Sequence, residues 1–283
     1  MRPYQWSKNL ILFAGLIFSQ NLFNLALFIK AALAFSLFCL VSSSIYLIND
    51  AIDFEDDCKH PRKSSRPISS GELSRSLAIY IAIPLAIFVL IVSFYLNISF
   101  GLAVLLYFII MNAYSLVLKK FIIVDIITIS LGFVLRAIAG AIVISVEFSS
   151  WLLICTILLA LFLVIGKRKQ ELIFLADKPI QYEDSPIKYS LPLLDQMMCV
   201  VSAATIMAYM LYTIWPATVQ KFHSTDLKYT IPFVLYSIFR YLYLVYKKGL
   251  CDSPEIILVS DKPLMIGIGL WITTVIIIIY FLP

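Results

Sequence analysis

Long, uninterrupted apolar runs are the feature that most restricts how this chain can fold. About 20 apolar residues cross the roughly 30 Å of hydrocarbon in a bilayer, and nine such runs can be marked off. We expect spans near residues 9–22, 25–48, 76–96, 98–118, 122–145, 150–170, 192–216, 228–247 and 263–282. Backbone polar groups inside a bilayer must be bonded internally, which favours helices. The sequence therefore predicts an all-α, polytopic membrane bundle of about nine transmembrane helices in a single domain over residues 1–283.

The composition supports this interpretation. Hydrophobic residues make up 61% of the chain and charged residues only 14%, with a mean hydropathy of +0.95. A soluble domain of this size would show far more polar surface. The N-terminal sequence MRPYQWSKN has no cleavage site before the next apolar run, so we expect no signal peptide.

The basic residues predict the orientation. Most of the 22 Lys and Arg residues fall in loops on the same side as the N-terminus, whereas Lys30, Lys221 and Lys228 fall on the other side. The positive-inside rule then gives a cytoplasmic N-terminus and an external C-terminus. The net charge of +5 is mostly juxtamembrane, which indicates contact with anionic headgroups and no nucleic-acid partner. Homo-oligomerisation is left open.

A charged stretch, NDAIDFEDDCKHPRKSSRPISSG, follows the second span at residues 49–71. If the helix continues past Asn49, then Asp50, Asp53 and Asp57 share one face, because they lie at offsets of 0, 3 and 7 residues. Converging carboxylates repel each other unless cations lie between them, and an oxygen-only ligand set suits Mg²⁺. We predict that these three aspartates bind Mg²⁺ shared with a substrate diphosphate, with Asn49 as a polar helper. The alternative is a solvated loop whose charges only anchor the topology.

Cations follow directly after these carboxylates. His60, Lys63 and Arg66 lie in a proline-flanked segment. An arginine can bind phosphate oxygens in bidentate fashion and a lysine as a point charge. We therefore predict that Lys63 and Arg66 hold phosphate oxygens that the metal does not bind, and act as the catalytic cations.

Two other charged clusters are expected on the cytoplasmic side. Tyr114 and Lys119 lie in NAYSLVLKK, and Lys167, Arg168 and Glu171 lie in GKRKQEL. We predict that these five residues contribute to binding the phosphorylated donor. The alternative for the second cluster is a pair of surface salt bridges at helical spacing, worth a few tenths of a kcal/mol.

Two arginines lie within predicted spans. Arg136, in DIITISLGFVLRAIAGA, should face the bundle interior and a partner, because a guanidinium at that depth is costly. It could bind an anion in a deep cavity, or form an interhelical hydrogen-bond knot over small-residue packing. Arg240 can instead extend toward the cytoplasm near Lys247.

The NDxxDxxxD pattern at 49–57, the stretch from Tyr114 to Lys120 and the spans resemble the UbiA superfamily of membrane-embedded transferases. This resemblance implies a helical cavity in which aspartates and Mg²⁺ hold a diphosphate. The segments RPYQWSKN at 2–9, FRYLYLV at 239–245 and DKPL at 261–264 are similar to the branch of decaprenyl-phosphate phosphoribosyltransferases. One departure from the superfamily is that only the widely spaced Asp177 and Asp184 follow the sixth span, where ring-prenylating members carry a second compact Asp-rich motif.

The resemblance to this branch implies a glycosyltransferase of the bacterial inner (plasma) membrane that serves cell-envelope biosynthesis. It would move 5-phosphoribose from phosphoribosyl diphosphate to a long-chain polyprenyl phosphate and release diphosphate. No general base is needed, because the acceptor is already an anion. We predict that the lipid phosphate contacts Lys8, Trp6, Asn9 and Arg136, with Trp6 at headgroup depth.

Two rival functions remain. The first is a UbiA-type enzyme that prenylates an aromatic ring with a prenyl diphosphate as donor. The second is a secondary transporter, which would usually carry its ionisable groups near the membrane midplane. In this chain, ionisable residues other than Arg136 and Arg240 lie at the edges of the spans or beyond, which favours an enzyme.

Overall fold

The computed structural model describes residues 3–59, 63–176, 189–247 and 254–282. These residues form helices and no strands, so the predicted all-α class is confirmed. Within these ranges, seven helices are long and apolar enough to cross a membrane. They are α2 (Leu25–Ile52), α4 (Arg75–Leu96), α5 (Ile98–Leu116), α6 (Val124–Val143), α7 (Ser150–Ala176), α8 (Leu191–Ile214) and α12 (Lys262–Phe281).

The predicted count of nine spans is not confirmed. The run at 228–247 becomes a short 3₁₀ turn, η5 (Asp226–Thr230), followed by the 17-residue helix α10 (Ile231–Lys247). The run at 9–22 becomes the 3₁₀ helix η1 (Pro3–Phe13) and one short helix, α1 (Ala14–Phe18). The chain then turns at Gln20, whose φ is +60°. Smaller elements are α3 (Phe54–Lys59), η2 (Lys63–Ser65), η3 (Leu118–Lys120), α9 (Pro216–Phe222) and α11 (Pro254–Ser260).

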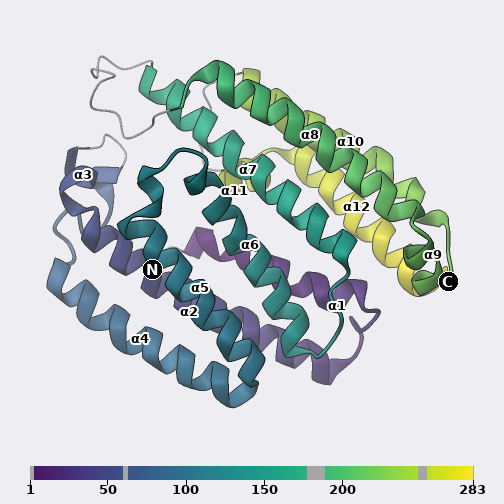
Figure 1. Cartoon of the computed structure of the whole chain (residues 1–283), viewed down its shortest axis with the longest axis horizontal. Helices are drawn as coiled ribbons and strands as arrows, with labels where there is room; N and C mark the ends of the chain where they lie inside the picture. Colours follow the sequence, from purple (N-terminus) through teal and green to yellow (C-terminus); the bar gives the residue numbers. More distant parts are fainter. Residues whose placement is uncertain (1–2, 60–62, 177–188, 248–253, 283) are drawn as a thin grey trace. The chain divides into compact units, whose positions relative to one another are not determined.

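The chain divides into two compact units, residues 1–147 and 148–283, and the single domain stays a prediction. In the first unit α2 packs on α4, α4 on α5, and α5 on α6, while η1 lies against both α2 and α6 (Figure 1). Its core includes the fully buried side chains of Leu12, Leu16, Phe38 and Phe100.

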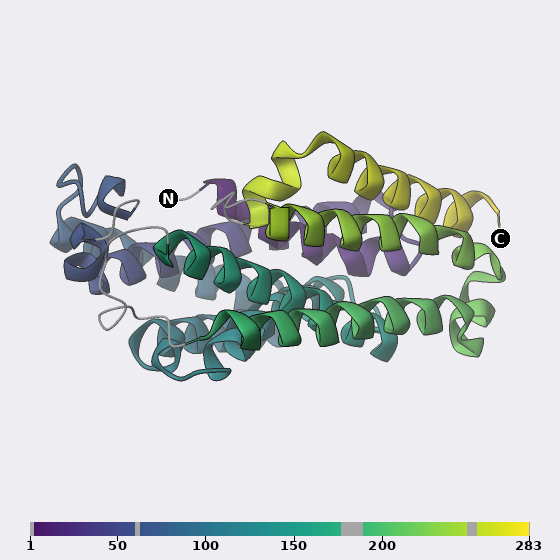
Figure 2. The same cartoon turned by 90° about the horizontal axis from the view of Figure 1, so that it is seen from above.

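The second unit is also built from neighbouring helices. Helix α7 packs along α8, and α10 runs beside α12, as Figure 2 shows. The buried ring of Phe162 on α7 contacts Tyr241 on α10, with 5.0 Å between ring centroids. Aromatic packing therefore joins these two helices.

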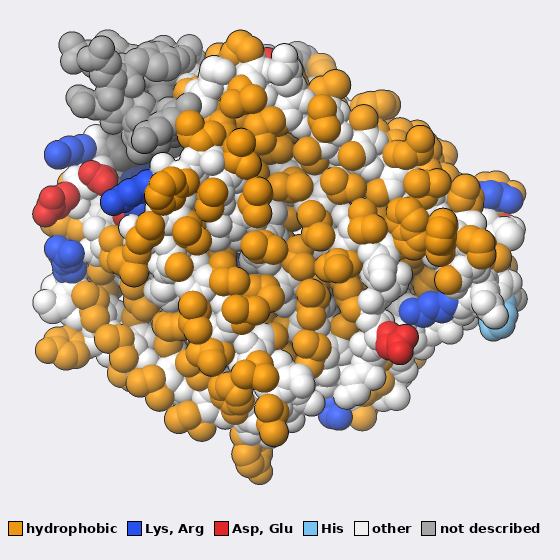
Figure 3. All heavy atoms as spheres, in the orientation of Figure 1, with side chains coloured by type: hydrophobic (Ala, Val, Ile, Leu, Met, Phe, Trp, Pro, Cys, Tyr) orange, Lys and Arg blue, Asp and Glu red, His pale blue; other side chains and the backbone are white. Residues whose placement is uncertain are grey.

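Local sequence explains where the long helices begin. Asn24 caps α2 by accepting from Ala26 N and Leu27 N, while Ser74 caps α4 and Asn97 caps α5. Such caps satisfy backbone N–H groups that have no partner within the helix. Hydrophobic side chains dominate the surface drawn in Figure 3, and examples such as Ile91 and Leu102 are more than half exposed. An exposed apolar surface of this kind suits lipid, so this is an integral membrane protein.

Candidate active site

The Asp-rich stretch bends where the sequence predicted a continuous helix. Helix α2 ends at Ile52, and Asp53 is its C-cap residue, with φ −85° and ψ 11°. The hydrogen bond from Asp57 N to Asp53 O, 2.8 Å long, carries the chain across the bend into α3. The three aspartates therefore do not lie on one unbroken helix face.

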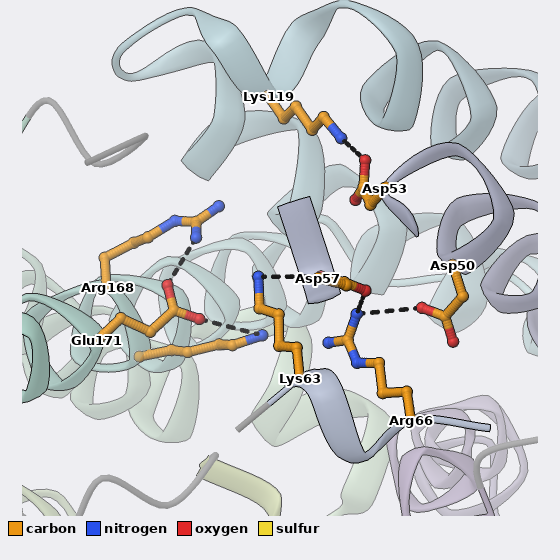
Figure 4. A network of polar contacts seen from close by, with 9 residues as sticks. Asp50, Asp53, Asp57, Lys63, Arg66, Lys119, Arg168 and Glu171 are labelled. Atoms are coloured by element: carbon orange, nitrogen blue, oxygen red, sulfur yellow. Dashed lines mark hydrogen bonds and ion pairs between the residues drawn. The ribbon is translucent and has the colours of Figure 1, made fainter. Parts of the chain in front are cut away.

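Asp50 and Asp57 are brought together by one arginine. Arg66 Nη1 donates to Asp50 Oδ1 at 3.1 Å and also donates to Asp57 Oδ2 (Figure 4). The Asp57 side chain is only 2% exposed and that of Asp50 only 9%. Two carboxylate oxygens from different helices thus meet at a single cationic nitrogen, which offsets the cost of burying their charges.

Lysines contact the same stretch. Lys119 in η3 (Leu118–Lys120) forms an ion pair with Asp53, and Lys63 Nζ lies 3.9 Å from Asp57 Oδ1 (Figure 4). Lys119 is thus brought to the Asp-rich stretch, and its role in a shared donor site stays a prediction. Asp53 points to Lys119 and does not join the other two aspartates on Arg66.

The other donor-binding residues predicted in the first unit lie nearby in the chain. Asn49 is in the last turn of α2, and its carbonyl oxygen accepts from Asp53 N at 2.9 Å. Tyr114 is in the last turns of α5, ahead of η3 and Lys119. Their roles in binding a donor stay predictions, as do the metal-binding roles of the three aspartates.

In the second unit, the charged end of α7 shows the side-chain pairs expected from the spacing. Arg168 Nη1 donates to Glu171 Oε2 at 2.7 Å (Figure 4). Lys167 Nζ lies 3.8 Å from Glu171 Oε1. Donor binding by Lys167, Arg168 and Glu171 stays a prediction. His60, Asp177 and Asp184 lie outside the described residues.

The charged end of α7 also contains a buried lysine that the sequence analysis did not single out. Lys169 is 4% exposed, and its Nζ lies 2.6 Å from Asp195 Oδ1 on α8. The hydroxyl of Tyr246 on α10 donates to the same carboxylate oxygen at 3.0 Å. These contacts join three helices, and no local sequence signal marks the pairing.

The N-terminal residues and Arg136 form one buried network. Arg136 Nε donates to Asn9 Oδ1 at 2.7 Å, and Arg136 Nη2 donates to Tyr107 OH at 2.6 Å. Trp6 Nε1 donates to Ser43 Oγ at 3.2 Å. Arg136 therefore forms the interhelical hydrogen bonds that were one of its two interpretations, to Asn9 in η1 and to Tyr107 in α5. Contact of Lys8, Trp6, Asn9 or Arg136 with a lipid phosphate stays a prediction.

Arg240 has a partner that the sequence did not reveal. Its Nε and Nη2 donate to the two carboxylate oxygens of Asp261 at 3.1 and 2.8 Å. Asp261 also caps α12 by accepting from Leu264 N at 2.8 Å. The hydrogen bonds from Arg240, reinforced by the one from Leu264 N, hold the pKa of Asp261 below its ordinary value of 3.8. The FRYLYLV and DKPL segments thus meet through this pair.

Comparisons with known proteins agree with the fold. The model of the UbiA prenyltransferase family matches residues 10–251. The chain is 31% identical to a decaprenyl-phosphate phosphoribosyltransferase of Corynebacterium glutamicum, over 100% of this chain and 86% of that protein. It is also 31% identical to the protein of the same name from Mycolicibacterium smegmatis, over 99% of this chain and 91% of that one.

Solved structures show the same fold. A UbiA homologue from Archaeoglobus fulgidus bound to DMAPP and Mg²⁺ aligns with a TM-score of 0.72 and 21% identity, covering 99% of this chain and 97% of that one. The family match and the named relatives, together with the helices above, define the class of helical, membrane-embedded transferases. Within that class, the chain belongs to the UbiA prenyltransferase family.

Proposed function

We propose that this chain transfers 5-phosphoribose from phosphoribosyl diphosphate to the phosphate of a long-chain polyprenyl phosphate and releases diphosphate. The observation that carries the proposal is the meeting of Asp50 and Asp57 at Arg66 Nη1. Carboxylates that suit a metal and a cation that suits phosphate thus lie in one place. The names of the relatives of similar length support the choice of donor and acceptor.

The donor set fits magnesium as a partial ligand shell. Asp50 and Asp57 already place one oxygen each around a single cationic nitrogen, and oxygen ligands suit Mg²⁺. Within the described ranges, no three His, Cys, Asp or Glu side chains gather closely enough to hold a metal by themselves. Mg²⁺ commonly takes one or two carboxylates and completes its shell with water and substrate phosphates. Asp50 and Asp57 would therefore hold the Mg²⁺ ion. Asp53, which forms an ion pair with Lys119, is a third candidate ligand.

In the proposed reaction, the bond between C1 of the ribose and the diphosphate oxygen breaks, and the diphosphate leaves with the electron pair. An oxygen of the acceptor phosphate forms the new bond to C1. When bound, Mg²⁺ supplies charge stabilisation to the leaving oxygens. Arg66 and Lys63 would add fixed positive charge beside the leaving diphosphate. Lys119, which is held beside Asp53, adds a third cation to the same region. No proton has to move, because the acceptor phosphate is already ionised.

The acceptor lipid is proposed to approach from the membrane. Its tail would lie along lipid-facing helices, and its phosphate would meet Lys8 in η1. We further propose that the enzyme resides in a bacterial inner membrane, with the N-terminus and the site cytoplasmic and the C-terminus outside. Anionic headgroups and juxtamembrane lysines favour this orientation.

A second candidate function is prenyl transfer from a prenyl diphosphate to an aromatic acceptor. It is favoured by the structural likeness to a UbiA homologue bound to DMAPP and Mg²⁺. The same pair of aspartates and Arg66 would then hold a prenyl diphosphate.

The identity of the donor that the chain uses distinguishes phosphoribosyl transfer from prenyl transfer. The purified chain in detergent is given Mg²⁺, a polyprenyl phosphate, an aromatic acid and either ribose-labelled phosphoribosyl diphosphate or labelled geranyl diphosphate. The proposal expects ribose label to enter the organic phase only when polyprenyl phosphate is present. Prenyl label on the aromatic acid, with no ribose label in lipid for several polyprenyl phosphates, would establish the second function instead.

A further inference from the structure

The N-terminal helix η1 has an unusual geometry. It is a 3₁₀ helix of 11 residues, Pro3–Phe13, whereas runs longer than three or four residues are uncommon because the 3₁₀ hydrogen bonds are poorer. Something outside the segment must therefore favour this form. In a 3₁₀ helix, side chains three residues apart lie on the same face, so Trp6, Asn9 and Leu12 form one stripe. In an α-helix the same three would spread over about 120°.

This stripe is the face that the rest of the unit holds. Asn9 and Leu12 are fully buried. Trp6 donates to Ser43, and Asn9 Nδ2 donates to Cys39 Sγ at 3.3 Å, so both bind α2. Ser7 and Leu10, which belong to another face, are exposed. The contacts of Trp6, Asn9 and Leu12 thus fall on residues spaced three apart, as in a 3₁₀ helix.

Helix α6 holds the same stripe at two points. Arg136 donates to Asn9. One helical turn further on, Gly140 lies against the backbone of Leu12, where an added Cβ would come within 2.8 Å of the Leu12 carbonyl carbon. The two points are four residues apart on α6 and three apart on η1, as expected for an α-helix beside a 3₁₀ helix.

Arg136 makes this contact at an energetic cost. It is 4% exposed, and its guanidinium lies over the rings of Tyr107 and Phe133 at 4.7 and 5.3 Å. Its hydrogen-bond partners, Asn9 and Tyr107, are neutral, and no carboxylate among the described residues forms an ion pair with it. Because a buried charge within a membrane helix is costly, such a residue is by default a candidate for a functional role.

We propose that Arg136 is a positioning residue that holds η1 in its 3₁₀ form through Asn9, and so fixes where Lys8 meets the acceptor phosphate. This inference rests on the proposed function. Relaxation of η1 to an α-helix would turn Lys8 by about 100° and shift it by about 2.5 Å relative to Phe13, because the two helices differ by about 20° and 0.5 Å per residue. In this proposal Arg136 and Asn9 act on the acceptor through Lys8, which replaces the direct contact with the lipid phosphate that the sequence analysis predicts for these two residues.

The kinetic test uses Asn9→Ala and the milder Tyr107→Phe, which keeps the ring and removes the hydroxyl bound to Arg136. Each should raise the KM for polyprenyl phosphate about tenfold, while kcat and the KM for phosphoribosyl diphosphate stay within about twofold. The matched control is Tyr209→Phe, which removes a buried hydroxyl bonded to Trp271 and Thr230 in the second unit. It should leave the acceptor KM unchanged. A fall in kcat with an unchanged acceptor KM in both test variants would overturn the proposal.

A measurement that needs no activity separates this inference from the proposed function. Spin labels at Leu10→Cys and Val117→Cys, both at exposed positions, report the distance between η1 and the end of α5. The background replaces four cysteines with serine: Cys58, Cys155, Cys199 and Cys251. Asn9→Ala should shift or broaden the distance distribution by about 2 Å or more. An unmoved distribution overturns the role of Arg136 even if transfer is normal. If Asn9→Ala shifts the distance distribution but the wild-type chain never transfers ribose, the proposed function is refuted instead.

Discussion

Arg66 and Asp50 are joined across sixteen residues of chain by a hydrogen bond of 3.1 Å from Nη1 to Oδ1. The same nitrogen binds Asp57 on the next helix. The loop after α3 therefore folds back onto the end of α2, which brings the cations and the carboxylates of one charged stretch to the same point. The function proposed here depends on this meeting.

Asp57→Asn should lower phosphoribosyl transfer at least about 100-fold, because it removes one of the two buried carboxylate charges that would hold Mg²⁺. The initial rate at saturating Mg²⁺ and donor measures the effect, with the thermal midpoint recorded alongside. The neighbouring Asp56 is exposed, so Asp56→Asn should keep the wild-type rate. A normal rate for a folded Asp57→Asn protein would exclude Asp57 as a metal ligand.

Arg66→Lys keeps the positive charge but removes the planar guanidinium, which can bind two phosphate oxygens of the donor at once. We expect the KM for the donor to rise about tenfold, with the acceptor KM unchanged. Arg75→Lys, at an exposed position at the start of α4, is the matched control and should behave as wild type. Equal changes in both KM values would mean that Arg66 supports the fold and does not bind the donor.

Asp261→Asn should lower the thermal midpoint by roughly 2 °C at pH 7, because it removes the carboxylate that pairs with Arg240 and caps α12. The pKa of Asp261 is depressed, so its contribution is present above the ordinary value of 3.8 and is lost as the pH falls through the folded-state value. The difference between variant and wild type should therefore shrink as the pH drops below 3.8. The exposed Glu72 provides the control, Glu72→Gln; a difference for Asp261→Asn that persists at low pH would contradict the pairing.

Gly140→Ala should lower the thermal midpoint by several degrees, because the new Cβ would overlap the backbone of Leu12, and overpacking of this kind costs about 1–3 kcal/mol. Gly269→Ala is a matched control in another membrane helix, since an added Cβ there meets nothing within 4 Å. It should leave the midpoint unchanged or raise it slightly. Equal midpoints for the two variants would show that α6 and η1 are not in close contact.

The long helices could be predicted from the sequence because an apolar run of about 20 residues has essentially one stable form in a bilayer. Residues 3–18 could not, since the apolar pattern does not distinguish a 3₁₀ helix packed on α6 from a short span. The aspartates could be picked out by their spacing, but the bend at Asp53 and its pairing with Lys119 depend on tertiary contacts. The Arg240–Asp261 and Lys169–Asp195 pairs join residues far apart in sequence, where no local pattern marks a partner.

The most direct test of the central claim is the metal dependence of ribose transfer by the purified wild-type chain, compared with Asp50→Asn and Asp57→Asn. Ribose-labelled phosphoribosyl diphosphate and polyprenyl phosphate are supplied with excess Mg²⁺ or with a chelator, and labelled lipid is counted. The proposal predicts labelled lipid from the wild type with Mg²⁺, almost none with the chelator, and almost none from either variant. Equal labelling with chelator, or by both variants, would contradict it.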